Sequence, residues 1–148
     1  MAGGAGLIYD FKGLSLIESR IKRLSCPQRT ELLDIIGAEI ESQVRRRIQD
    51  EKTSPDGTDW AAWSDSYAAR RPEGRTLLMS EDHMLDSITH LTMDKDSIEV
   101  GSNMIYAATH QYGDDDRNIP ARPYLGISDD NEEDLIDAVD DYLEGIMQ

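Results

Sequence analysis

The sequence predicts an α+β fold in which a small antiparallel sheet is flanked by a long N-terminal helix and an acidic C-terminal helix. Apolar residues recur at steps of three and four over residues 28–51 and again over residues 129–147, which is the spacing of one helical face. Between these segments, the stretches HLTMD and SIEVGS flank Lys95-Asp96 and predict a hairpin. A chain of 148 residues fits one domain with its own core.

The first thirteen residues, MAGGAGLIYDFKG, are glycine-rich with scattered apolar side chains. Residues 1–13 are therefore predicted to be a flexible arm, or one that becomes ordered on a partner. They lack the basic segment and long apolar core of a signal peptide. Residues 14–148 are predicted to form the single α+β domain, which begins with a short helix over about residues 15–24. No apolar run in the sequence approaches the length of a membrane span.

The long helix has the most regular pattern in the chain. Pro27 stands where a helix can begin, and the apolar face follows it. Arg45, Arg46 and Arg47 fall in the last turns, where cations suit the helix dipole and the solvent. A basic patch that faces a partner is the alternative for these three arginines. The apolar face consists of Leu32, Leu33, Ile36, Ile40, Val44 and Ile48.

A tight turn and two tryptophans follow this helix. In the sequence Ser-Pro-Asp-Gly, Pro55 and Gly57 occupy the second and fourth positions of a β-turn. Trp60 and Trp63 are three residues apart and close to that turn. Such a pair predicts either a plug of the core or the anchor of an interface. Both interpretations remain open at this stage.

Capping residues predict three further short helices. Ser64 suits the N-cap of one helix, and Ser80 suits the N-cap of a second whose apolar stripe covers residues 84–88. Asn103 is expected to cap a third helix, which ends at Gly113. The last helix of the chain is acidic in its first turns, where carboxylates suit the dipole. Its apolar face is predicted to be Leu135, Ile136, Val139, Tyr142, Leu143 and Ile146.

The stretch YAATHQYGDDDRNIPARPYLGIS, residues 106–128, predicts a rigid elbow. His110 and Gln111 are expected to end a packed helix, and Gly113 to break it. The chain then returns in an extended conformation, because each proline disfavours helix in the residue before it.

Two prolines restrict the backbone of the extended segment that is predicted to follow Gly113. Pro120 and Pro123 flank Arg122 and limit how far its backbone can swing. We expect the Arg122 guanidinium to make a fixed contact with a carboxylate, either within the chain or on a neighbouring subunit. The acids of the run Asp114–Asp116 are possible partners across such an interface.

Catalysis and metal binding find little support in the residue pattern. His110 with Asp114, Asp115 and Asp116 offers suitable ligand types, but consecutive aspartates point in different directions and no EF-hand spacing is present. The single cysteine, Cys26, has no recognisable nucleophile context and fits a reducing cytosol. No phosphate-binding glycine loop and no nucleophile elbow occur. We therefore expect no enzyme activity, no metal and no cofactor.

The charge is strongly asymmetric. The chain carries a net charge of −15, and residues 112–148 hold twelve acids against two bases. This balance excludes ordinary phosphate-backbone binding, which needs a basic footprint. It suits a basic partner protein, or a surface from which nucleic acid is repelled. The ordinary alternative is that the acids only keep the protein soluble.

Four motifs occur in a fixed order, namely SPDGTDWAAWSDSYAARR, LLMSEDHMLDSI, IEVGSNMIYAATHQYG and IPARPYLGIS, and an acidic terminal helix follows them. This series resembles the phage virion morphogenesis family, which includes tail completion proteins of P2-like phages and a neck protein of Mu-like phages. Each motif alone is weak, but the ordered set is specific and covers roughly residues 30–145. The turn before the second helix and the acid run Asp114–Asp116 depart from the family pattern.

The resemblance implies a structural virion protein similar in role to tail terminators. Such proteins form rings, commonly hexamers, between the head connector and the tail tube, and genomic DNA passes through the lumen. The protein would be made in the bacterial host cytoplasm and reside in the neck of the virion. The interface residues would include Trp60, Trp63, Arg122 and the run Asp114–Asp116. The alternative from another class is a monomeric acidic mimic of nucleic acid that inhibits a basic host protein.

Overall fold

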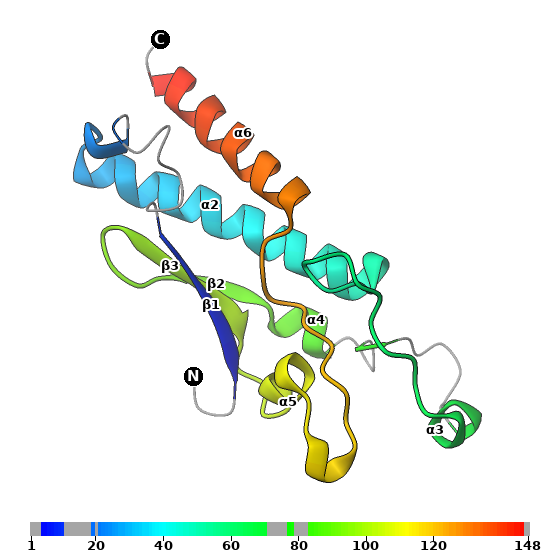
Figure 1. Ribbon diagram of the computed structural model, residues 1–148. Coiled ribbons are helices and arrows are strands. Elements are labelled where there is room, and N and C mark those ends of the chain that lie inside the picture. The colour runs from blue at the N-terminus through cyan, green and yellow to red at the C-terminus, as the bar shows by residue number, and fades with distance from the viewer. Residues whose placement is uncertain (1–3, 11–18, 20, 71–76, 79–82, 147–148) are drawn as a thin grey trace.

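The computed structural model describes residues 4–10, 19, 21–70, 77–78 and 83–146. Its architecture is α+β, as predicted, with three layers (Figure 1). A three-stranded antiparallel sheet packs on one side of helix α2 (Cys26–Arg46), and helix α6 (Asp129–Ile146) packs on another side of α2. The long N-terminal helix is thus the central layer that both other layers contact.

The sheet has the strand order β1-β3-β2. Strand β2 (Thr89–Thr92) and strand β3 (Ser97–Ser102) form the predicted hairpin. Strand β1 (Ala5–Asp10) pairs antiparallel with the other edge of β3. Ile98 and Val100 of β3 are buried, which identifies the side of the sheet that faces the core.

The prediction of an arm over residues 1–13 is wrong for residues 5–10, which form β1. Ala5 and Leu7 lie opposite Ser102 and Val100 and contribute to the core. The glycine-rich composition concealed this strand because its partner lies about ninety residues further along the chain. A pairing so distant leaves no local signal in residues 1–13.

Helix α2 begins with a capping box. Ser25 Oγ accepts a hydrogen bond from the Gln28 backbone N–H at 3.3 Å, and Gln28 Oε1 accepts one from the Ser25 N–H at 3.0 Å. The helix therefore begins at Cys26, slightly before the predicted boundary, and all six predicted apolar residues are buried. Its continuation, η2 (Arg47–Glu51), is a π-helical turn that ends at Lys52 in a left-handed conformation.

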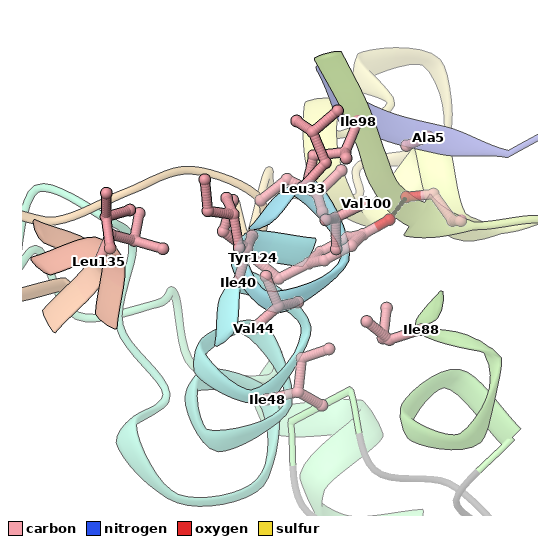
Figure 2. Packing of buried hydrophobic residues seen from close by; sticks show 14 of the residues in the cluster. Ala5, Leu33, Ile40, Val44, Ile48, Ile88, Ile98, Val100, Tyr124 and Leu135 are labelled. Atoms are coloured by element: carbon pink, nitrogen blue, oxygen red, sulfur yellow. Dashed lines mark hydrogen bonds between the residues drawn. The ribbon is translucent and has the colours of Figure 1, made fainter. Parts of the chain in front are cut away.

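The core lies on both sides of α2. Figure 2 shows Leu33, Ile40 and Val44 of α2 in the centre, with Leu135 of α6 on one side and the sheet residues on the other. Three of the predicted α6 positions, Leu135, Val139 and Leu143, are buried, whereas Ile136 and Tyr142 are half-buried and Ile146 is exposed. The outer side of α6 carries only acidic charge.

Three short helices connect these layers. Helix α3 (Asp65–Arg70) is capped by Ser64, as predicted, through a 3.3 Å bond from the Tyr67 N–H. Helix α4 (His83–Ser87) contains the predicted stripe residues Met84 and Leu85, but the predicted cap, Ser80, lies outside the described residues. Half of the helix predicted over residues 15–24 also falls outside them, and residues 19, 21 and 22 of the described half are helical.

Helix α5 (Ala107–Tyr112) differs from the prediction at its start. Its N-cap is Tyr106, which makes no capping bond with its side chain, so the assignment of this role to Asn103 is wrong. The backbone turn from Met104 to Ala107 enters the helix without a side-chain cap, because the Ala107 N–H donates to the Met104 carbonyl at 3.0 Å. The helix ends at Gly113 as predicted, with a φ angle of 75°.

Candidate functional site

The predicted elbow contains a segment that is held almost entirely by side chains. Residues 122–126, Arg-Pro-Tyr-Leu-Gly, have no regular secondary structure, lie beside α5 and are called the strap below. The side-chain amide of Gln111 in α5 makes hydrogen bonds to the strap backbone of the kind that a neighbouring strand would make. Its Oε1 accepts from the Tyr124 and Leu125 N–H groups at 3.1 and 3.0 Å, and its Nε2 donates to the Leu125 carbonyl at 3.5 Å. A single amide thus satisfies three backbone groups of the strap.

Arg47 holds the strap from the other side. Its guanidinium is buried and donates to the Tyr124 and Gly126 carbonyls at 2.8 and 3.2 Å, and to Asn131 Oδ1 of α6 at 2.6 Å. Burial lowers the pKa of Arg47, and the charge of Glu51 opposes this shift. The prediction that Arg47 serves the helix dipole in solvent is therefore wrong. The π turn, which carries Arg47, begins where α2 meets the strap.

Arg122 is also part of the fold, and its partners are not the predicted ones. Its Nε donates to the Ala61 carbonyl at 2.8 Å and its Nη2 to the Ala62 carbonyl at 3.2 Å. Its own N–H donates to the His110 carbonyl at 2.7 Å. The side chain is buried, and burial lowers its pKa. The expected carboxylate contact within the chain is therefore wrong, because the Ala61 and Ala62 carbonyls take its place. A contact with a carboxylate of a neighbouring subunit stays a prediction.

The two tryptophans have different environments. Trp60 is buried, and its Nε1–H donates to the Pro123 carbonyl at 2.8 Å, so it belongs to the core and to the strap. Trp63 is only half-buried and packs edge-on against Tyr67 of α3, with ring centroids 5.5 Å apart. Trp63 is thus the more exposed of the two, and the interface role predicted for the pair stays a prediction.

His110 and Tyr124 complete the support beneath the strap. The Tyr124 hydroxyl donates to the Ala107 carbonyl at 2.8 Å, and burial raises the pKa of this phenol. Burial, followed by the nearby charge of Arg122, lowers the pKa of His110 and favours the neutral imidazole. The buried Nδ1 of His110 has no hydrogen-bond partner within the described part of the chain. His110 is thus packed in the elbow, as predicted.

The three residues of the acid run Asp114–Asp116 have different environments. Asp114 caps the short helix η3 (Asp115–Arg117) and accepts from Arg117 Nε at 2.7 Å, an interaction that lowers the pKa of Asp114. Its backbone exchanges two 2.8 Å bonds with Ile119. Asp115 and Asp116 are exposed. Among the described residues, no cluster of His, Cys, Asp or Glu could hold a metal ion.

The predicted turn residues Pro55, Gly57 and Gly113 lie at the two ends of the elbow. The Gly57 N–H donates to the Ser54 carbonyl at 2.9 Å, which confirms the tight turn. Pro55 of this turn packs against Gly126, where an added Cβ would lie 2.4 Å from the Pro55 Cγ. At Gly113, an added Cβ would lie 2.7 Å from the Ala121 backbone N. Pro120 precedes this close approach and is exposed.

Sequence reasoning missed two features. The first is the set of strap partners outside the elbow, Arg47 and Asn131, whose roles depend on contacts across more than seventy residues. The second is an apolar surface on the sheet, where Ile8, Leu91 and Met93 are exposed. Recognition of β1 as a strand could have revealed the second feature, because Ile8 and Leu91 pair with the same residue, Glu99, and therefore lie on one side of the sheet.

The hydrogen bonds of the elbow fix the positions of neighbouring elements. Its polar side chains, Gln111, Arg47, Arg122 and Trp60, are occupied by backbone groups. None of the described helices is long and apolar enough to cross a membrane. What the elbow does is hold the turn of residues 54–57, α5 and the start of α6 at fixed positions.

Comparison with known proteins agrees with the motif order. The phage virion morphogenesis family matches residues 10–144. The chain is 31% identical over 116 residues to the Putative capsid assembly protein G of Escherichia phage Mu, covering 71% of this chain and 73% of that protein. It is 34% identical over 78 residues to the Mu-like prophage FluMu G protein 2 of Haemophilus influenzae, covering 49% and 56%.

A third relative comes from an archaeon. The uncharacterized protein MJ0331 of Methanocaldococcus jannaschii is 31% identical over 94 residues, which is 60% of this chain and 66% of that protein. No solved structure gives a significant match. The family match covers α2, strands β2 and β3, the whole elbow and α6 as far as residue 144. The chain therefore belongs to the phage virion morphogenesis family.

Proposed function

We propose that this chain is a structural component of the phage neck that completes the tail and joins it to the head connector. The observation that carries the proposal is the family match over residues 10–144, in which the motif residues serve to fix shape. The name of the phage Mu relative, a putative capsid assembly protein, supports a role in particle assembly. We propose no catalytic step and no cofactor.

In this proposal the subunits form a ring, expected to be a hexamer, that contacts the tail tube on one side and the head connector on the other. A ring needs two different surfaces on each subunit that close by rotation. The acidic outer side of α6 supports a lumen through which DNA passes, because phosphates and carboxylates repel one another. The protein would reside in the virion after synthesis in the host cytoplasm.

Deletion of the gene from the phage genome that encodes it tests this function. We expect DNA-filled heads and separate tails that do not join, or tails of abnormal length, with infectivity restored when the wild-type gene is supplied in trans. Electron microscopy of lysates and plaque counts measure the outcome. Normal infectious particles from the deletion strain would refute the proposal.

A mass-spectrometric inventory of purified particles separates this function from that of an acidic inhibitor. A neck component is present in every particle at a stoichiometry set by its ring. An inhibitor that mimics nucleic acid is absent from particles and co-purifies with a basic host protein. Absence from particles would therefore contradict the neck proposal, whatever the phenotype of the deletion.

A further inference from the structure

We propose that one face of the sheet packs against the same face of a second copy of this chain, related by a two-fold axis. This surface, called the outer face, is formed by Ile8, Leu91, Met93 and Glu99. The contact pairs the Glu99 carboxylate of each copy with Lys95 of the other. The inference concerns the free protein and does not rest on the proposed ring, because a ring needs two different surfaces on each subunit.

The outer face carries three exposed apolar side chains beside one carboxylate. Ile8 of β1 and Leu91 of β2 both pair with Glu99 of β3, which places the three residues side by side on the sheet. The Met93 N–H donates to the Ser97 carbonyl at 3.0 Å, so Met93 continues the hairpin on the same side as Leu91. Ile8 is 58% exposed, Leu91 63% and Met93 48%. These apolar side chains therefore form one contiguous patch.

The patch lies on the side of the sheet opposite to the core. Ile98 and Val100 precede and follow Glu99 in β3, and both are buried in the core that α2 shares. Side chains alternate along a strand, so Glu99 and its neighbours on β1 and β2 point the other way. An antiparallel sheet with one solvated face normally presents polar residues on that face. A group of exposed apolar side chains there instead marks an interaction surface.

Glu99 is half-buried, and the described part of the chain supplies no hydrogen bond or ion pair to its carboxylate. Its side chain leans over β1, because a Cβ added at Gly6 would lie 2.9 Å from Glu99 Cδ. Gly6 pairs with Gly101, so the carboxylate lies further from the tip of the β2–β3 hairpin than the Glu99 backbone does. The apolar patch thus occupies the end of the face near the tip, and the negative charge occupies the other end.

Lys95 supplies the opposite charge at the tip of the hairpin, where it is exposed. At about 3.3 Å per residue, the tip lies about 20 Å along the hairpin from Gly101. This separation keeps Lys95 from reaching the Glu99 carboxylate of its own copy. Each copy therefore carries a cation at one end of the outer face and a carboxylate at the other, with the apolar patch between them.

A two-fold axis that crosses the strands at Ile98 makes this arrangement self-complementary. It sets the strands of the two copies antiparallel and brings Lys95 of each copy over the end of the face that carries the Glu99 carboxylate of the other. Met93 of one copy then lies over Leu91 of the second. The alternative axis, parallel to the strands, gathers both carboxylates at one end and both lysines at the other, which like charges oppose. Charge therefore selects the antiparallel arrangement.

The size of the outer face predicts a weak dimer. Two sheets that pack face to face complete a layered architecture in the same way as a sheet and a helix. Three strands of up to six residues present a face of about 14 Å by about 20 Å, or about 300 Å². A standard interface buries about 800 Å² on each partner. The dimer should therefore form in concentrated solution and dissociate on dilution.

Charge exchange between two variants of the full chain tests the contact by analytical ultracentrifugation over a series of concentrations. Copies of Glu99→Lys would bring two lysines together at each end of the interface, and copies of Lys95→Glu would bring two glutamates together. Each variant alone should self-associate about tenfold more weakly than the wild type. An equimolar mixture of the two should recover most of the wild-type association, because both contacts between unlike variants again join opposite charges.

Recovery on mixing requires that the two residues meet between copies, since a folding defect in either variant would not be repaired by the other. A wild-type protein that stays monomeric throughout the concentration series overturns the inference. So does a mixture that associates no better than the two variants alone.

A second pair of variants tests the apolar patch. Leu91→Ser removes an apolar side chain from the centre of the proposed interface and should also weaken self-association about tenfold. The matched control is Ile105→Ser, whose side chain is 86% exposed but lies before α5 and outside the outer face. The control should associate like the wild type. Equal losses in the two variants would indicate non-specific apolar association and overturn the inference.

The outcomes distinguish this inference from the proposed function. If the protein is present in particles but the mixed variants show no recovery, the neck function stands and the two-fold contact fails. If mixing restores the association but the protein is absent from particles, the two-fold contact stands and the neck function fails.

Discussion

Arg47 and Arg122 show how this chain uses buried charge. Both guanidinium groups donate to peptide carbonyls, and Arg47 adds one amide oxygen, Asn131 Oδ1. The backbone segments that receive these bonds lie outside regular strands, so they have no ladder partners of their own. An arginine with five donors in a fixed fork can satisfy two carbonyls at once, which a lysine does less well.

Arg122→Ala should therefore destabilise the folded subunit, and not only an interface. The substitution leaves the Ala61 and Ala62 carbonyls without donors, which costs about 1–3 kcal/mol in the free energy of unfolding. Denaturant unfolding followed by circular dichroism measures the change. The matched control is Arg117→Ala, whose exposed pair with Asp114 contributes less than about 1 kcal/mol. Equal losses in the two variants would contradict the assigned role of Arg122.

Lys52 gives the subunit a pH dependence in the alkaline range. Burial lowers its pKa from 10.5 to about 8, with the charge of Asp50 opposing the shift, and its Nζ donates to the Ile48 and Leu77 carbonyls. Since the folded state releases this proton before the unfolded state does, stability should rise as pH increases from about 8 towards 10.5. Urea unfolding at intervals across this range measures the slope. In Lys52→Met this component of the slope should disappear, and an unchanged slope would rule out Lys52 as its source.

At the scale of elements, the contact between α2 and β2 depends on a glycine inside a helix. Gly37 lies where the ring of His90 crosses α2, and an added Cβ would lie 2.5 Å from His90 Cδ2. His90 is held there by Glu41 and Asp34, at 2.6 and 2.8 Å from its two ring nitrogens. Burial alone would lower the pKa of His90, but these two carboxylates raise it above its ordinary value.

Gly37→Ala should lower the melting temperature although alanine is a better helix former by about 1 kcal/mol. The added methyl group forces His90 away from its two carboxylates, and this loss exceeds the gain in helix propensity. The control is Gly145→Ala in α6, where an added Cβ meets nothing within 4 Å and stability should increase by about 0.5–1 kcal/mol. Thermal unfolding of the two variants gives opposite signs if the contact is as described, and two increases would contradict it.

The elements that could be predicted from sequence are those whose pattern of apolar or turn residues lies within the element itself. The apolar periods of α2 and α6, the hairpin of β2 and β3 and the turn at Pro55 and Gly57 were all correctly predicted. Strand β1 was missed because its hydrogen bonds go to residues 97–102. The carboxylate partner expected for Arg122 within the chain was wrong, because sequence reveals charges but not which carbonyls lack donors. Of the predicted interface residues, Asp115 and Asp116 are exposed and Trp63 is half-buried, and the interface role of the whole set stays a prediction.

At the scale of the whole molecule, most of the net negative charge lies on helix α6. The described part of α6 carries nine acids and no base, and α6 packs on α2 rather than on a basic surface. Repulsion along such a helix opposes folding and is screened by salt. The net charge of −15 therefore has a cost in stability as well as a proposed use in the lumen.

Raising the ionic strength should consequently stabilise the subunit. From about 10 mM to about 150 mM salt the Debye length falls from about 30 Å to about 8 Å, which screens the repulsion between acids on successive turns of α6. We expect the melting temperature to rise over this range. A variant with Asp137→Asn and Asp141→Asn should show a smaller rise, and an equal rise would place the repulsion elsewhere.

The strap has a consequence for the order in which the chain folds. Its bonds join residues 122–126 to Arg47, Trp60 and Gln111, so most of them span long intervals of sequence and require other elements to be in place. Closure of long loops is slow, and contacts of this kind form late. Strap substitutions such as Gln111→Ala should therefore accelerate unfolding while leaving the refolding rate nearly unchanged. The residues that fix the mature shape of the elbow would then determine how long a subunit survives, and hardly how fast it forms.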